Sequence, residues 1–340
     1  MQKTLKSLQK LLLNNSKNSL FTHKQIQNFY EAQQKFQLSE QKLQDFKNKG
    51  IAVLPEILDP QQLDEVINYT KQMIKKSDGF QKQKVIFSSG NSERGQAFIQ
   101  TGDKIHYFFE NLQTFTEEQE KTDALDFENK IALNKIAHAQ HDLDPFFEQF
   151  SYQQVFKNIL QKIGYKNPRC VQSMYIFKNP KIGGEVGPHT DNTFLTTTPL
   201  SCMGIWIALH DATIENGCLY ALEGSHKKAT NYFMVRTEDQ QEVTFIGEEP
   251  KNLDLSKGTP LQVKRGSIVL IDGNAVHYSY HNASKKPRHA FTLHFVEGED
   301  QGYKWSEKNW MQRGKHLPFR NYYEIVDQVQ KKGWQNYIQK

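Results

Sequence analysis

The hydrophobic and polar positions of the first part of the chain follow helical spacing. Ser39 is expected to cap a helix that runs through Asn48 and ends at Gly50. Residues 51–54 are apolar and predict a short strand directly after that helix.

A second helix is predicted to begin at Asp59 and Pro60, because a capping residue followed by proline is typical of a first helical turn. We expect this helix to end at residues 77–79, where serine, aspartate and glycine interrupt the pattern. Residues 115–165 also indicate mostly helical structure.

The pattern changes after Arg169. Short stretches rich in β-branched and aromatic residues alternate with Gly, Pro, Asn and Asp. The predicted strands cover residues 171–177, 204–209, 259–263, 267–271 and 290–295. Helices followed by many short strands favour an α+β protein. Its core is expected to be a double-stranded β-helix, the jelly-roll or cupin-like arrangement, with flanking helices that are mainly N-terminal.

The length and charge of the chain favour one large domain with a basic extension. We expect a domain over residues 38–325, between an extension of residues 1–37 and a tail of residues 326–340. The whole net charge of +5 comes from the extension, which has six lysines and one glutamate, so the rest of the chain is neutral. This distribution does not indicate a nucleic-acid partner.

Two interpretations of the extension are open. Residues 1–30 contain no acidic residue, and Leu5, Leu8 and Leu12 share one helical face. That composition is typical of a mitochondrial transit peptide. It fits equally well an amphipathic helix that docks on the body of the protein or on a partner protein. The expected location is therefore mitochondrial or, alternatively, cytoplasmic.

The cysteines and apolar runs exclude other classes. Cys170, Cys202 and Cys218 have no paired spacing, which favours a reduced, intracellular protein without a cysteine-rich zinc site. The longest apolar runs, such as residues 268–271, are too short to predict a transmembrane helix.

Candidate chemistry begins at His189-Thr190-Asp191, the only His-x-Asp triplet in the chain. On a strand, residues i and i+2 face the same side, so His189 and Asp191 can offer ligands to one metal ion. A second histidine would complete the two-His-one-carboxylate triad of non-heme Fe(II) oxygenases. His277 is the best candidate, because it follows a predicted strand and a turn.

Arg288 precedes the last predicted strand and can point into the same cavity as His277. Its planar guanidinium binds a carboxylate bidentately. Iron with open positions, together with an arginine behind it, is the arrangement that 2-oxoglutarate needs. The sequence therefore predicts a dioxygenase that uses Fe(II), O2 and 2-oxoglutarate as cosubstrate.

A series of short motifs surrounds these residues in one order along the chain. They cover residues 172–178, 183–186, 188–191, 204–208, 215–218, 224–226 and 265–271. In this combination they resemble the phytanoyl-CoA dioxygenase family, over roughly residues 38–325.

The resemblance implies roles for individual residues. His189, Asp191 and His277 match the iron ligands. The positions that match contacts to 2-oxoglutarate are Lys135, Met174, Thr190, Trp206, Ser279 and Arg288. The family also implies hydroxylation of a small-molecule substrate, with an acyl-CoA or another organic acid as candidates. Contacts to that substrate are expected before residue 170 and in residues 227–258.

Simpler interpretations of single residues remain open. Lys135 could be a solvated lysine on a helix, and Trp206 could be an ordinary core residue. The ten histidines outside the triad, among them His294, are expected to be hydrogen-bonded core residues.

Two other functions compete with the dioxygenase. The protein could be an accessory or scaffold subunit of a larger, mitochondrial assembly that keeps the fold and docks through residues 1–37. A zinc hydrolase would use the same ligands, but it would leave Arg288 and Lys135 without a role.

Overall fold

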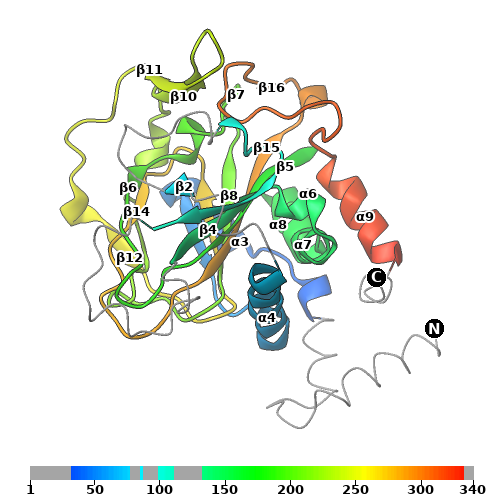
Figure 1. Cartoon of the computed structure of the whole chain (residues 1–340), viewed down its shortest axis with the longest axis vertical. Helices are drawn as coiled ribbons and strands as arrows, with labels where there is room; N and C mark the ends of the chain where they lie inside the picture. Colours follow the sequence, from blue (N-terminus) through cyan, green and yellow to red (C-terminus); the bar gives the residue numbers. More distant parts are fainter. Residues whose placement is uncertain (1–31, 77–84, 87–98, 111–131, 333–340) are drawn as a thin grey trace.

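The computed structural model describes residues 32–76, 85–86, 99–110 and 132–332. Its centre is a pair of β-sheets, with helices gathered on one side (Figure 1). The larger sheet has eight strands, in the spatial order β1 (Ile51–Leu54), β13 (Ile268–Asp272), β8 (Met203–Ala208), β15 (Ala290–Glu297), β5 (Pro168–Ile176), β4 (Leu133–His138), β3 (Ile105–Phe109) and β2 (Val85–Ile86).

The smaller sheet supplies the opposite wall. Its order is β12 (Thr259–Leu261), β9 (Leu219–Ala221), β14 (His277–Ser279) and β6 (Val186–His189). Two further pairs lie outside these sheets: β10 (Phe233–Arg236) with β11 (Val243–Ile246), and β7 (Thr197–Thr198) with β16 (Lys304–Trp305). All described strand pairs are antiparallel except β2 with β3. This is the jelly-roll core with flanking helices that the sequence predicts.

Helices cover the face of the larger sheet that points away from the smaller one (Figure 1). They are α3 (Glu40–Lys49), α4 (Pro60–Lys76), α6 (Gln140–Leu143), α7 (Pro145–Ser151), α8 (Gln154–Ile163) and α9 (Tyr322–Lys332). In α8, Val155, Phe156, Ile159 and Leu160 form the buried stripe of an amphipathic helix. Phe147 of α7 stacks on Phe291 of β15, with ring centroids 5.3 Å apart. The main hydrophobic core therefore lies between the helices and this sheet.

The first predicted helix and strand are confirmed. The Ser39 hydroxyl accepts a hydrogen bond from the backbone N–H of Lys42, and α3 begins at the next residue after Ser39. Gly50 ends the helix with a φ of 78°, a left-handed conformation that favours glycine. The predicted strand of residues 51–54 is β1.

The later elements match less evenly. The second helix begins at Pro60 as predicted, while its expected end at residues 77–79 lies outside the described residues. The five predicted strands after Arg169 all form, with ends that shift by at most three residues.

The prediction of helix across residues 115–165 is wrong for Leu133–His138, which form β4. The helical part is confirmed only for α6, α7 and α8, and residues 115–131 lie outside the described chain. Strand β4 is buried on both faces between β3 and β5, so its sequence lacks the alternation that identifies a strand.

The domain boundary predicted at residue 325 falls inside α9. Val326 and Val329 belong to the main core, and the Tyr322 hydroxyl donates to the carbonyl of Ser151 at 2.7 Å. The last described helix therefore packs against the same body. No helix within the described ranges is long and apolar enough to cross a membrane.

Candidate active site

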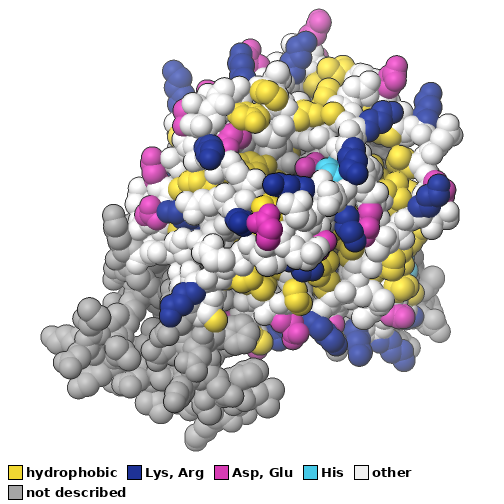
Figure 2. Space-filling view, turned by 180° about the vertical axis from the view of Figure 1, so that it is seen from behind, with side chains coloured by type: hydrophobic (Ala, Val, Ile, Leu, Met, Phe, Trp, Pro, Cys, Tyr) yellow, Lys and Arg dark blue, Asp and Glu magenta, His cyan; other side chains and the backbone are white. Residues whose placement is uncertain are grey.

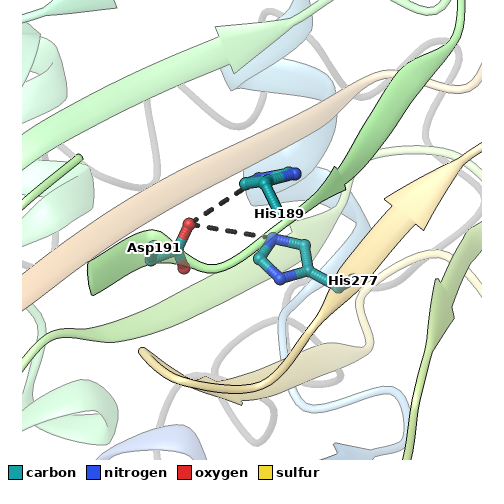
Figure 3. Close-up of side chains that lie close together, drawn as sticks. All are labelled: His189, Asp191 and His277. Atoms are coloured by element: carbon teal, nitrogen blue, oxygen red, sulfur yellow. Dashed lines mark ion pairs between the residues drawn. The ribbon is translucent and has the colours of Figure 1, made fainter. Parts of the chain in front are cut away.

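The two sheets bring His189, Asp191 and His277 together (Figure 3). His189 ends β6 and lies directly opposite His277 of β14 in the antiparallel register. Nε2 of His189 and Nε2 of His277 lie 3.9 and 3.7 Å from Oδ1 of Asp191. One ligand atom from each residue lies within 4.8 Å of the others, a spacing that fits one metal ion.

Asp191 does not continue the strand, as the sequence argument assumed. Strand β6 ends at His189, and Asp191 begins a short 3-10 turn, Asp191–Thr193. Thr190 between them is extended, with φ −119° and ψ 143°. The i, i+2 relation therefore still places both side chains on the same side.

Backbone carbonyls orient both imidazoles in the same way. Nδ1 of His189 donates to the carbonyl of Gly187 at 2.8 Å, and Nδ1 of His277 donates to the carbonyl of Ala275 at 3.0 Å. A carbonyl can only accept, so the proton lies on Nδ1 and the lone pair of Nε2 faces the cluster. Metal-binding histidines typically have such a second hydrogen bond.

The charge states of the triad suit metal binding. Burial, followed by the nearby His277, lowers the pKa of His189 to about 3, so this imidazole is neutral at neutral pH. Burial alone would raise the pKa of Asp191, but His294 and His277 hold it below its usual value. The site therefore offers two imidazole nitrogens and one carboxylate, the ligand set of a non-heme iron centre.

The triad lies in a cavity of about 470 Å³ between the sheets. Figure 2 shows a hollow in one face of the molecule, with a histidine and an acidic side chain at its edge and Lys and Arg side chains around it. Arg288, Ser279, Trp206 and Thr292 line the same cavity.

Several polar atoms in this cavity have no hydrogen-bond partner in the described part of the chain, and four of them are Arg288 Nη1, Ser279 Oγ, Trp206 Nε1 and Thr292 Oγ1. All four can donate a hydrogen bond. Buried polar groups are normally paired, so such a cluster indicates a ligand that accepts hydrogen bonds. A carboxylate or keto oxygen of 2-oxoglutarate fits this requirement.

Arg288 is the charged member of the group and is only 1% exposed. Its Nε donates to the carbonyl of Gly217 at 3.0 Å, and its guanidinium carbon lies 5.5 Å from the centre of the Trp206 ring. Burial lowers the pKa of Arg288 to about 10, which still leaves it positive at neutral pH. A buried cation is costly without an anionic partner, so the residues fit an anionic cosubstrate.

The other predicted contacts also line the cavity. Lys135 lies on β4 and is 8% exposed, so the interpretation of a solvated lysine on a helix is wrong. Met174 of β5 aligns with Thr292 of β15 in the sheet register. Thr190 reaches the cavity too, with its hydroxyl 2.9 Å from that of Thr193.

The sequence analysis missed the place of His294. Nε2 of this residue lies 3.5 Å from Oδ2 of Asp191, and the ring lines the cavity, so His294 is more than the core residue that was expected. The signal that could have found it is the two-residue period of a strand. Thr292 and His294 lie on the cavity face of β15, and Arg288, an even number of residues before them, also lines the cavity.

Comparisons with known proteins agree with this site. The family model "Phytanoyl-CoA dioxygenase (PhyH)" matches residues 46–290. The "Phytanoyl-CoA dioxygenase domain-containing protein 1 homolog" of Caenorhabditis elegans is 38% identical over 82% of this chain and 97% of its own. The homolog of the same name from Dictyostelium discoideum is 40% identical over 83% of this chain and 99% of its own.

A solved structure shares the fold. The epimerase SnoN, in complex with Fe3+, alpha ketoglutarate and nogalamycin RO, matches with a TM-score of 0.56 at 11% identity, over 83% of this chain and 92% of that one. Together with the family match and the His-Asp-His cluster, these findings define the class of enzyme. The chain belongs to the phytanoyl-CoA dioxygenase family and is a 2-oxoglutarate-dependent non-heme iron dioxygenase.

Proposed function

We propose that this dioxygenase hydroxylates a small organic molecule in the cavity between the sheets. One observation carries the proposal: the metal triad faces the same cavity as a buried arginine that has no carboxylate partner in the described part of the chain. His189, Asp191 and His277 would hold the iron. When bound, the iron supplies O2 activation coupled to the conversion of 2-oxoglutarate to succinate and CO2.

The residues of the chain provide orientation and charge. Arg288 would pair with the far carboxylate of 2-oxoglutarate, and Ser279 would donate to the same group from β14. Ser279 is two residues from His277 on that strand, so both side chains can face the cavity. The indole of Trp206 would form a wall and donate one hydrogen bond. With the far carboxylate held there, the keto acid end would face the triad.

Aromatic residues near the triad support an apolar substrate surface. The ring of Phe194 meets His189 edge-on, with centroids 5.8 Å apart. Phe245 packs edge-on against Phe194 and stacks on Tyr232 at 4.8 Å. All three aromatic residues line the cavity.

The substrate itself stays a proposal. Tyr232, Phe245 and Leu253 belong to the 227–258 segment in which substrate contacts are predicted, and all of them line the cavity. Lys135 and His138 line it from the part before residue 170. We infer that a molecule with an apolar part contacts these walls, with acyl-CoA thioesters and other organic acids as candidates.

The test is 2-oxoglutarate turnover by the purified protein with Fe(II). We expect succinate, and we expect His189→Ala and Arg288→Ala to abolish it. Arg169→Ala is the matched control, because Arg169 pairs with Asp300 near the surface and away from the cavity. Turnover unchanged in both cavity variants would contradict the proposal. If the wild-type protein turns over 2-oxoglutarate, extract fractions screened with mass spectrometry for a gain of one oxygen would identify the substrate.

The scaffold hypothesis and the mitochondrial location concern residues 1–37, of which residues 1–31 lie outside the described chain. Both stay predictions. Size-exclusion chromatography of native extract tests the scaffold hypothesis, because an assembly subunit elutes well ahead of a 39.6 kDa monomer.

A further inference from the structure

The two oxygens of the Asp191 carboxylate have different neighbours. Oδ1 faces the imidazoles of His189 and His277 at 3.9 and 3.7 Å. Oδ2 points the other way and lies 3.5 Å from Nε2 of His294, on β15 of the larger sheet. One oxygen is therefore turned to the metal ligands and the other to a residue outside the triad.

No other group holds Oδ2. It has no hydrogen bond within the described ranges, and its ion-pair contact is the imidazole of His294. His294 is itself buried, with 6% exposure, and its Nδ1 has no hydrogen-bond partner in the described residues either. A buried imidazole whose one polar contact is a metal-binding carboxylate has no evident purpose in packing alone.

Gly204 makes room for this contact. It lies opposite His294 in the register of β8 and β15. A Cβ atom at position 204 would lie 3.1 Å from Oδ2 of Asp191 and 3.6 Å from Cδ2 of His294. Gly204 thus packs closely against the carboxylate and the imidazole, and a larger residue at this position would press against both groups.

We propose that His294 is a positioning residue that keeps Oδ2 away from the metal, so that Asp191 binds iron through Oδ1 alone. The inference rests on the iron site of the proposed function. Groups behind a metal ligand typically fix its orientation in this way. Binding of Asp191 through one oxygen determines the number of free positions on the metal.

Two histidines and one carboxylate oxygen leave three positions on an octahedral ion. Bidentate 2-oxoglutarate needs two of them and O2 needs the third. A carboxylate bound through both oxygens would occupy one of these positions. His294 therefore preserves the space for the cosubstrates through its contact with Asp191.

The test measures metal and cosubstrate binding without turnover. Wild type, His294→Leu and His294→Gln are titrated with Co(II), followed by its visible absorption. The Fe(II)-loaded proteins are then titrated anaerobically with 2-oxoglutarate, followed by the charge-transfer band of the complex. The control is His289→Gln, because His289 is also buried and precedes the same strand, yet it bonds Tyr175 and does not line the cavity.

We expect His294→Leu to weaken Co(II) binding by about 10- to 100-fold. The charge-transfer band should appear only at higher 2-oxoglutarate. His294→Gln should recover part of both, because an amide can also donate to Oδ2. His289→Gln should bind Co(II) with wild-type affinity, even if the variant is less stable than the wild type. Wild-type affinities for both ligands in His294→Leu would overturn the proposal.

Two further measurements keep the proposal falsifiable. If His294→Leu does not fold, Gly204→Ala tests the same contact, because the added methyl group lies against Oδ2 of Asp191 and the ring of His294. This variant should also bind Co(II) more weakly than the wild type. An unchanged affinity would contradict the positioning role. X-ray absorption of the Fe(II)-loaded wild type and His294→Gln should find the same number of bound imidazoles. One fewer in the variant would make His294 a ligand and overturn the proposal. A wild type that binds metal but does not convert 2-oxoglutarate would defeat the proposed function, while these binding tests still stand.

Discussion

Asp142 and Arg288 are both buried charges, each with about 1% of its side chain exposed, but their surroundings are opposite. Asp142 lies in α6 and receives hydrogen bonds from Arg313, Arg320 and the Tyr152 hydroxyl. Arg288 lies at the cavity and has no carboxylate partner in the described part of the chain. The first charge is satisfied by the fold, whereas the second is left for a ligand.

The Asp142 cluster joins distant parts of the chain. Arg313 also donates to the carbonyl of Val171, and Arg320 donates to Glu148 at 2.7 Å. These contacts tie the segment before α9 to α6, α7 and β5. The comparison shows how burial alone misleads: a buried charge indicates a binding site only when its partners are missing.

The largest expected effect is on stability, from Asp142→Asn. The change leaves Arg313 and Arg320 without their buried anion, which costs about 3–5 kcal/mol. Denaturant unfolding measures the loss, and calorimetry of 2-oxoglutarate binding should show affinity within two-fold of wild type. The control is Asp211→Asn, because the exposed pair with Lys264 is worth at most about 1 kcal/mol. Equal losses in the two variants would show that the cluster is not a structural one.

The reverse pattern is expected for Arg288→Met. Loss of a buried charge partner should weaken 2-oxoglutarate binding by at least about 2 kcal/mol, or roughly 30-fold. Replacing an unpaired buried cation with an apolar side chain should leave stability unchanged or raise it. Calorimetry with a redox-inert metal and denaturant unfolding measure the two quantities. Easier unfolding with unchanged cosubstrate affinity would place Arg288 with Asp142 as a structural charge.

The smallest effect is a pH dependence of the Asp142 cluster. Burial raises the pKa of Asp142, but His141, Arg313 and Arg320 lower it by more than burial raises it. The pKa in the folded state therefore lies well below the usual value. A depressed carboxyl pKa stabilises the fold fully above the unfolded value near 3.9, and the contribution is lost as pH falls. The stability gap between wild type and Asp142→Asn should therefore shrink by about 1 kcal/mol from pH 5 to pH 3. A constant gap in unfolding experiments across this range would contradict the sign.

Most of the metal site could be predicted because its residues belong to local patterns. His189 and Asp191 are two residues apart, and His277 and Arg288 lie beside strands that the sequence identifies. Sheet pairing then brings His277 opposite His189, which no local pattern shows. The expectation of a distant strand with a second histidine was enough to find it.

Strand β4 of the larger sheet was less predictable than β5, β8, β13 and β15, because its sequence lacks the alternation that identifies a strand. The sequence around β4 predicts helix. Lys135 was therefore identified only by its match to the family, and its position in the sheet was not predicted. His294 was missed because an isolated histidine in an apolar strand has no distinguishing neighbours. Its role depends on a contact with Asp191 across more than a hundred residues of sequence, and only the register of the sheets creates that contact.

The cavity walls come from separate parts of the chain, and this division has an evolutionary consequence. The iron ligands and Arg288 sit on or beside paired strands, whereas Tyr232, Phe245 and Leu253 come from the segment around the β10–β11 hairpin. Mutations in that segment can alter the shape of one cavity wall while every ligand of the metal stays in place. A lineage with this architecture can therefore acquire new substrates by gradual drift of one loop region, and it retains a working oxidant at each step.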